Sequence, residues 1–215
     1  MTSTPNAEPD RVAAARQKRV WDKAAPGYDK QIAFFEKSWF SGGREWLTSR
    51  ARGQVLEVAI GTGRNLPGYP AEASLTGIEL SPAMLAIARQ RAADLGREAD
   101  LRDGDAEQLP FDDASFDTVV CALSLCTIPS PVAAVGEMWR VLRPGGRLLL
   151  LDHIGSTWPP VYAAQWLAER VTIRAAGEHF TRRQLPLVQA AGFQIVEAER
   201  LKAGTVERIH AVKPA

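Results

Sequence analysis

A buried strand that runs directly into a glycine turn constrains this chain more than any other feature. Residues 55–60 read VLEVAI, an apolar and β-branched run that is typical of a strand covered on both faces of a sheet. Gly61 and Gly63 follow this strand, and glycine lets a ligand approach the backbone closely. Open α/β sheets bind nucleotides at the carboxyl ends of such strands. We therefore expect an α/β fold, a Rossmann-like doubly wound sheet, with a nucleotide site after residue 60.

Two carboxylates, and one departure from a known motif, indicate which nucleotide this site binds. A dinucleotide fingerprint starting at Gly61 needs Gly or Ala at position 66, where this chain has Leu66. Glu57 is a carboxylate inside the apolar strand, and its burial is costly unless a partner compensates for it. The cationic sulfonium and ammonium groups of S-adenosylmethionine would do so. Glu79 ends the next expected strand, residues 74–79, where an acidic side chain can bind ribose hydroxyls. The alternative is a generic nucleotide turn with a surface glutamate.

Length and composition restrict the class of protein. A chain of 215 residues is long enough for one domain with a proper core. The formal net charge of +1 argues against a broad nucleic-acid footprint. No Cys/His cluster has zinc-ligand spacing, so we expect no metal. The two cysteines, Cys121 and Cys126, form no paired framework, which fits a reducing cytoplasm.

The N-terminal region allows a membrane contact but does not require one. Residues 1–10 are polar, contain Pro5 and Pro9, and are expected to be disordered. Residues 11–22 can form a basic amphipathic helix, which could lie peripherally on the inner face of a membrane. The alternative is a helix that packs on the domain and has no contact with a membrane. We favour packing, because the apolar face of this helix is mostly alanine and buries little area.

An aromatic-rich region follows. Residues 24–29 read as a loop, and residues 32–47 as a helical region interrupted at Gly42 and Gly43. The aromatic side chains of this region form either a lid over an apolar pocket or part of the core. We therefore expect residues 11–52 to be a helical lid and residues 53–215 to be the nucleotide-binding domain.

The later elements follow from capping residues and spacing. Ser81 and Pro82 begin a helix that Gly96 ends. Helices are expected at residues 131–142 and 181–191, and strands at 99–102, 116–123 and 147–152. Residues 154–180 form a long insertion, a cap, of the kind that is often functional. Only three residues separate the strands at 193–201 and 205–212, so they pair as an antiparallel hairpin at the end of a mostly parallel sheet.

Five segments together resemble the class I S-adenosylmethionine-dependent methyltransferases. They are VLEVAIGTG (55–63), TGIELSPAML (76–85), GDA (104–106), LPFDDASFD (109–117) and RVLRPGG (140–146). The resemblance covers nearly the whole chain and implies the class I fold, with S-adenosylmethionine as cofactor and S-adenosylhomocysteine as product. The family usually has Gly where this chain has Ala59.

The resemblance also implies roles for individual residues. The cofactor would be held by Tyr28, Glu57, Ala59, Gly61, Thr62, Gly63, Asn65, Leu66, Glu79, Leu80, Met84, Asp105, Ala106, Glu107, Leu123 and Ser124. Tyr28 would also close over the methyl group and is a catalytic candidate. His153, at a strand end, and His179, in the insertion, are candidate bases, with a structural role slightly favoured for each.

The acceptor is expected to be an apolar small molecule or a lipid. Residues 21–29 are similar to phosphatidylethanolamine N-methyltransferases and to ubiquinone/menaquinone C-methyltransferases. Residues 123–128, 152–153 and 177–183 resemble lipid-associated thiol methyltransferases. The first hypothesis is N-methylation of phosphatidylethanolamine. The alternatives are S-methylation of small thiols, O- or C-methylation of a phenol or quinone-like metabolite, and a regulatory protein that only binds S-adenosylmethionine. A nicotinamide oxidoreductase conflicts with Leu66.

Overall fold

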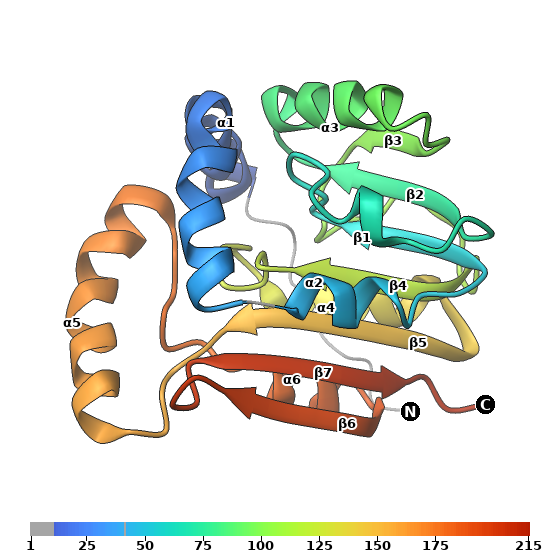
Figure 1. Ribbon diagram of the computed structural model, residues 1–215. Helices are drawn as coiled ribbons and strands as arrows, with labels where there is room; N and C mark the ends of the chain where they lie inside the picture. The colour runs from blue at the N-terminus through green and yellow to red at the C-terminus, as the bar shows by residue number, and fades with distance from the viewer. Residues whose placement is uncertain (1–10, 41) are drawn as a thin grey trace.

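The computed structural model describes residues 11–40 and 42–215, so the disorder expected for residues 1–10 lies outside the described residues. Seven strands form one sheet in the order β3-β2-β1-β4-β5-β7-β6 (Figure 1). The strands β1 to β5 pair in parallel, whereas β7 pairs antiparallel with both β5 and β6. This confirms the expected mostly parallel sheet with a C-terminal hairpin. The strands are β1 (Gln54–Val58), β2 (Ser74–Glu79), β3 (Asp100–Asp103), β4 (Phe116–Ala122), β5 (Leu142–His153), β6 (Gln194–Leu201) and β7 (Val206–Val212).

Helices cover both faces of the sheet. Val55 and Leu56 are both fully buried but belong to two different apolar clusters, because successive side chains of a strand face opposite sides. One cluster includes residues of α4 and α6, and the other includes residues of α2 and α3. The helices are α1 (Arg11–Ser38), α2 (Gly43–Thr48), α3 (Pro82–Asp94), α4 (Pro131–Val141), α5 (Pro159–Ala176) and α6 (Leu185–Ala190), with a short 3₁₀ helix at Leu66–Gly68.

The start of α3 forms as its capping residues predict. The Ser81 hydroxyl accepts a hydrogen bond from the backbone N–H of Met84 at 3.2 Å, and Pro82 occupies the first turn. Gly96, with φ of +60°, ends the helix. Because β2 ends only two residues earlier, the cap fixes this helix N-terminus beside the turn that follows β1.

The prediction of a loop at residues 24–29 is wrong, because α1 continues through these residues as one helix of 28 residues that contains Pro26. An internal proline costs a helix about 3 kcal/mol. Tertiary contacts on both sides of Pro26 offset this cost. The Asp22 carboxylate accepts from the Ser81 hydroxyl at 2.6 Å, and the Asp29 carboxylate accepts from the Thr62 hydroxyl at 2.7 Å. Ala25 between them is 3% exposed.

The insertion is helical rather than an irregular loop. It contains α5, and none of the 18 residues of this helix is buried. The helix expected at residues 181–191 begins only at Leu185, with Pro186 in its first turn. Upstream, the Thr181 N–H donates to the Glu169 carboxylate at 2.7 Å, which holds this backbone outside a helix. Among the described residues, no helix is long and apolar enough to cross a membrane.

Candidate cofactor and acceptor site

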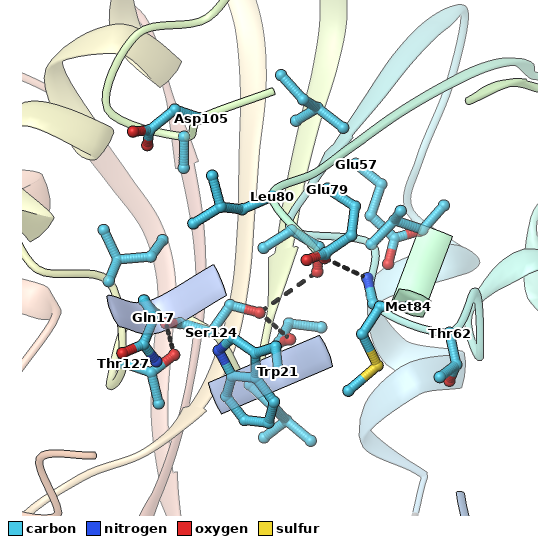
Figure 2. Close-up of a pocket in the computed structure, with 18 of the residues that line it drawn as sticks. Gln17, Trp21, Glu57, Thr62, Glu79, Leu80, Met84, Asp105, Ser124 and Thr127 are labelled. Atoms are coloured by element: carbon cyan, nitrogen blue, oxygen red, sulfur yellow. Dashed lines mark hydrogen bonds between the residues drawn. The ribbon is translucent and has the colours of Figure 1, made fainter. Parts of the chain in front are cut away.

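A cavity lies at the carboxyl ends of β1, β2 and β4, with α1 along one side (Figures 1 and 2). It encloses about 850 Å³, its open mouth included. Most of the residues expected to bind the cofactor line it. They are Tyr28, Glu57, Ala59, Gly61, Thr62, Glu79, Leu80, Met84, Asp105, Ala106, Leu123 and Ser124. Four do not reach its surface, namely Gly63, Asn65, Leu66 and Glu107. A sequence motif therefore marks both the wall of the site and the layer that supports it.

The turn after β1 holds the Glu79 carboxylate in place. The N–H of Gly61 donates to one carboxylate oxygen at 2.8 Å, and the N–H of Ser81 donates to the other at 2.9 Å. Burial raises the pKa of Glu79, and these backbone donors oppose the increase. A Cβ added to Gly61, whose φ is +60°, would meet no atom within 4 Å and would project into open space. Glu79 lies on the cavity wall and keeps acceptor capacity, so this edge fits hydroxyl donors such as those of a ribose.

Two strand ends are held in a strained backbone conformation. Ala59 after β1 has φ of +54°, and Leu123 after β4 has φ of +55°. Residues other than glycine rarely adopt this left-handed region, at a cost of about 1–3 kcal/mol each. Both residues line the cavity. Ala59 thus adopts the left-handed conformation that glycine, the residue usual in the family, adopts without this cost.

Side chains of the protein itself compensate for the burial of the Glu57 carboxylate. It is 3% exposed, and its carboxylate accepts from the Asn65 amide at 2.7 Å and from the Tyr69 hydroxyl at 2.8 Å. Burial raises the pKa of Glu57 to about 7, and the two donors oppose this increase. Its burial therefore does not require a bound cation, contrary to the argument made from the sequence. Glu57 still borders the cavity, where its negative form would favour a cationic group.

The opposite wall combines one carboxylate with apolar side chains. Asp105 follows β3, and one of its carboxylate oxygens accepts from the N–H of Glu107 at 2.9 Å. The carboxylate keeps acceptor capacity for an amino group such as that of adenine. Ile78, Leu80 and Ile128 line the cavity around it. Such a wall fits a flat, largely apolar base with a polar edge.

The side formed by α1 includes residues that sequence reasoning missed. Ala14, Gln17 and Trp21 line the cavity, together with Tyr28, which the sequence did predict. Their spacing of three, four and seven residues places them on one helical face. Ala14, Gln17 and Trp21 fall within the helix predicted at residues 11–22, and their spacing alone does not distinguish a cavity wall from packing on the domain. The rings of Trp21 and Tyr28 pack edge to face, with centroids 5.9 Å apart.

Tyr28 stays protonated near neutral pH. Burial raises its pKa to about 12, mainly because the phenolate would lose its hydration. Of the three catalytic candidates, Tyr28 is the one that lines the cavity. As a neutral phenol it can orient an acceptor or pack against it, but it does not provide a base.

The two histidine candidates lie outside the cavity wall. His153 Nε2 is 3.2 Å from the Glu178 carboxylate and 4.0 Å from that of Asp152. Burial alone would lower the pKa of His153, but these carboxylates outweigh burial and raise it. His179 Nδ1 is 3.3 Å from Glu169. Neither histidine borders the cavity, and a catalytic role for either one stays a prediction.

His153 also belongs to a buried polar cluster that sequence spacing does not reveal. The side chains of Cys126, Asp152 and His153 lie within 4.8 Å of one another. The two Asp152 oxygens already accept from the N–H groups of Cys126, at 3.1 Å, and His153, at 2.8 Å. Burial raises the pKa of the Cys126 thiol, which keeps it protonated. These hydrogen bonds give the cluster a structural role, because they hold together the chain segments at the ends of β4 and β5.

The segment after β4 gives the cavity a hydroxyl-rich end. Ser124 donates to the carbonyl of Ala122 at 2.9 Å, and Thr127 donates to the carbonyl of Ser124 at 3.0 Å. The other described residues of this segment that line the cavity are Ala122, Leu123, Ile128 and Pro129. None of these side chains titrates near neutral pH.

The comparisons with known proteins agree with this geometry. A family model described as a methyltransferase domain matches residues 56–150. A phosphatidylethanolamine N-methyltransferase from Cereibacter sphaeroides is 41% identical over 115 residues, which are 53% of this chain and 57% of that protein. The match thus covers less than two thirds of that relative's length. A demethylmenaquinone methyltransferase from Thermus thermophilus is 33% identical over 163 residues, which are 71% of this chain and 70% of that protein.

A solved structure shows the same fold. It is that of an S-adenosylmethionine-dependent methyltransferase from Thermotoga maritima, with a TM-score of 0.72 and 21% identity, covering 92% of this chain and 99% of that one. The donor set of the cavity fits S-adenosylmethionine: Glu79 offers acceptors for ribose hydroxyls, Asp105 offers one for an amino group, and Glu57 offers negative charge. The chain belongs to the class I S-adenosylmethionine-dependent methyltransferases, with S-adenosylmethionine as its cofactor.

Proposed function

We propose that the enzyme methylates the amine of a lipid head group, with phosphatidylethanolamine as the acceptor. The observation that carries the proposal is the end of the cavity after β4, whose described lining residues include no side chain that titrates near neutral pH. Elsewhere on the cavity wall, Tyr28 has a pKa of about 12. Glu57, with a pKa of about 7, has its two carboxylate oxygens engaged by Asn65 and Tyr69. A phenol or carbon acceptor needs a base to remove its proton, whereas a neutral amine or a thiolate attacks without one.

The residues of the chain would promote transfer by holding the cofactor and the acceptor in alignment. Bound S-adenosylmethionine supplies an electrophilic methyl group on a cationic sulfur. Glu79 and Asp105 would hold the ribose and the adenine, which limits where the sulfonium and its methyl group can lie relative to the acceptor. Trp21 and Tyr28 cover one side of the cavity and limit the access of water. Alignment of this kind can lower a barrier by about 7–11 kcal/mol.

An amine acceptor needs only to lose its proton before transfer. Alkyl amines titrate near pH 10 in water, at about the value of a lysine side chain. Entry into an apolar site disfavours the charged form and lowers this pKa, so that water can take the proton. The relative named phosphatidylethanolamine N-methyltransferase, 41% identical over 115 residues, supports an amine over a thiol.

An acceptor panel with radiolabelled S-adenosylmethionine tests the proposal. The panel contains phosphatidylethanolamine in mixed micelles, alkyl and aryl thiols, quinone precursors and simple phenols. We expect label in the lipid fraction and in no other acceptor. Label in thiols alone, or in quinone precursors or phenols alone, would contradict the proposal. Lipid whose amine is already trimethylated is the matched control, because it presents the same surface with no site for transfer.

A further inference from the structure

The α5 segment carries five large apolar side chains that remain substantially exposed. Trp158, Tyr162 and Trp166 recur every four residues and are 59%, 43% and 47% exposed. Leu167 and Val171, also four residues apart, are 62% and 69% exposed. Side chains at this spacing are neighbours on a helix surface. The two rows lie about 100° apart around the helix, so α5 presents two exposed apolar stripes instead of burying them.

The end of α1 extends this surface. Phe34, Phe35 and Trp39 are 72%, 54% and 48% exposed. The Trp39 indole donates to the Thr205 hydroxyl at 2.8 Å. We call these three side chains and the five of α5 the α1–α5 face. Other large exposed side chains, such as Val132 and Val196, lie on different elements. A gathering of this kind, unlike scattered apolar residues, marks an interaction site.

Hydrogen bonds link α1 and α5 near both ends of α5, through the β6–β7 hairpin turn at one end and directly at the other. The hairpin turn that holds Trp39 also accepts, through the Ala203 carbonyl, a hydrogen bond from Ser156, just before α5, at 2.6 Å. At the far end of α5, the Gln17 amide donates to the Ala176 carbonyl at 3.1 Å. The helices thus run antiparallel along one side of the molecule (Figure 1). The two apolar groups belong to a single side of the fold.

The acidic and basic side chains of the two helices differ in their surroundings. All four of their acidic side chains are held by groups of the protein: Asp22 by Ser81, Asp29 by Thr62 and Arg91, Glu36 by Arg44 and Arg64, and Glu169 by the Thr181 N–H. Basic side chains instead remain exposed, namely Arg11, Arg19, Lys23, Lys30 and Lys37 on α1 and Arg170 and Arg174 on α5. The Arg170 guanidinium lies 3.4 Å above the Trp166 ring. The two helices therefore expose both aromatic side chains and positive charge.

We propose that the α1–α5 face docks on the surface of an anionic lipid bilayer. Tryptophan and tyrosine favour the boundary between head groups and acyl chains, and basic residues around them are attracted to anionic lipid. A second copy of this chain is a poorer occupant, because a symmetric contact would set the same cationic faces against each other. The membrane contact foreseen at residues 11–22 is thereby shifted to α5 and the end of α1. Docking is independent of which acceptor the enzyme methylates.

Vesicle sedimentation with the full chain tests this docking. The vesicles contain phosphatidylcholine alone or mixed with phosphatidylglycerol, and no phosphatidylethanolamine, so methyl transfer plays no part in the readout. We expect binding to the anionic vesicles that weakens as salt rises. The double variant Trp166→Glu/Leu167→Glu should lower the partition coefficient about tenfold or more. The matched control, Val132→Glu/Val196→Glu, makes the same change at equally exposed sites and should bind like the wild type.

Melting temperature and S-adenosylhomocysteine affinity show whether both variants fold. Equal binding by the two double variants would overturn the proposal. A wild-type chain that does not bind to anionic vesicles would also overturn it. A wild-type dimer without lipid that dissociates in the Trp166→Glu/Leu167→Glu variant would assign the face to self-association and also contradict it. Failure here leaves the proposed amine acceptor untouched, because that proposal is tested in micelles by transfer of label.

Discussion

The cofactor half of the molecule and the helical cover are stabilised in different ways. Around β1, β2 and α3, buried polar groups are paired by close neighbours, as Glu57 is by Asn65 and Tyr69. In the cover, α1 is tied to the rest of the chain by partly exposed contacts with residues far along the sequence, such as the hydrogen bond from Gln17 to Ala176, 159 positions away. The first region is a dense buried network, and the second exposes its apolar side chains. Cofactor binding is thus built into the sheet, while acceptor and surface contacts depend on the cover.

The largest expected effect tests the buried network through its pH dependence. Burial raises the pKa of Glu57 from 4.5 to about 7, so the folded state binds more protons than the unfolded state between these values. The contribution of Glu57 to stability is therefore present below about pH 4.5 and is lost as pH rises to about 7, by about 3 kcal/mol in all. Urea unfolding of Glu57→Gln from pH 4.5 to 8 should lack this loss. Parallel curves for the wild type and the variant would contradict the assignment.

A second substitution tests the cofactor edge. Removal of the Glu79 carboxylate by Glu79→Ala should weaken S-adenosylhomocysteine binding by about 30-fold, because hydrogen bonds to a charged group contribute about 1.5–3 kcal/mol. Titration calorimetry measures the change. Asp100→Ala removes an exposed carboxylate from the neighbouring β3 and serves as control. Unchanged affinity in the Glu79 variant would remove this residue from the site.

A smaller effect is expected where the cover meets the cofactor half. Asp22 on α1 accepts from the Ser81 hydroxyl at 2.6 Å at the start of α3. Asp22→Ala should therefore lower stability by about 1 kcal/mol and loosen the cover over the cavity. Thermal unfolding and S-adenosylhomocysteine affinity report the two consequences, with Lys23→Ala, at an adjacent exposed side chain, as the comparison. If both variants behave alike, the Asp22 contact contributes nothing.

The same contrast explains what the sequence could predict. The strand that begins the motif, the Gly61 turn and the Ser81 cap depend on neighbours in sequence, and the structure confirms them, with the strand ending at Val58 rather than at residue 60. The hairpin follows from the three residues between its strands. These features are local, so sequence patterns specify them directly.

The parts that could not be predicted depend on partners far along the chain. Pro26 predicts a break in α1, but the contacts of Asp22 and Asp29 with distant residues keep the helix continuous. The pairing of His153 with Glu178 depends on how the insertion folds back over β5. For Glu57 the sequence indicated the need for a partner, but that partner proved to be Asn65 and Tyr69.

The most direct test of the account is the pH dependence of methyl transfer to phosphatidylethanolamine micelles by the wild type and by His153→Gln. If no residue acts as a base, the rate rises with deprotonation of the amine itself, and the two proteins agree within about threefold at every pH. The contrary result is a wild-type rate that follows a titration above the ordinary histidine range, in line with the raised pKa of His153, and that disappears in the variant. That result would make His153 the base and would contradict an acceptor site that works by position alone.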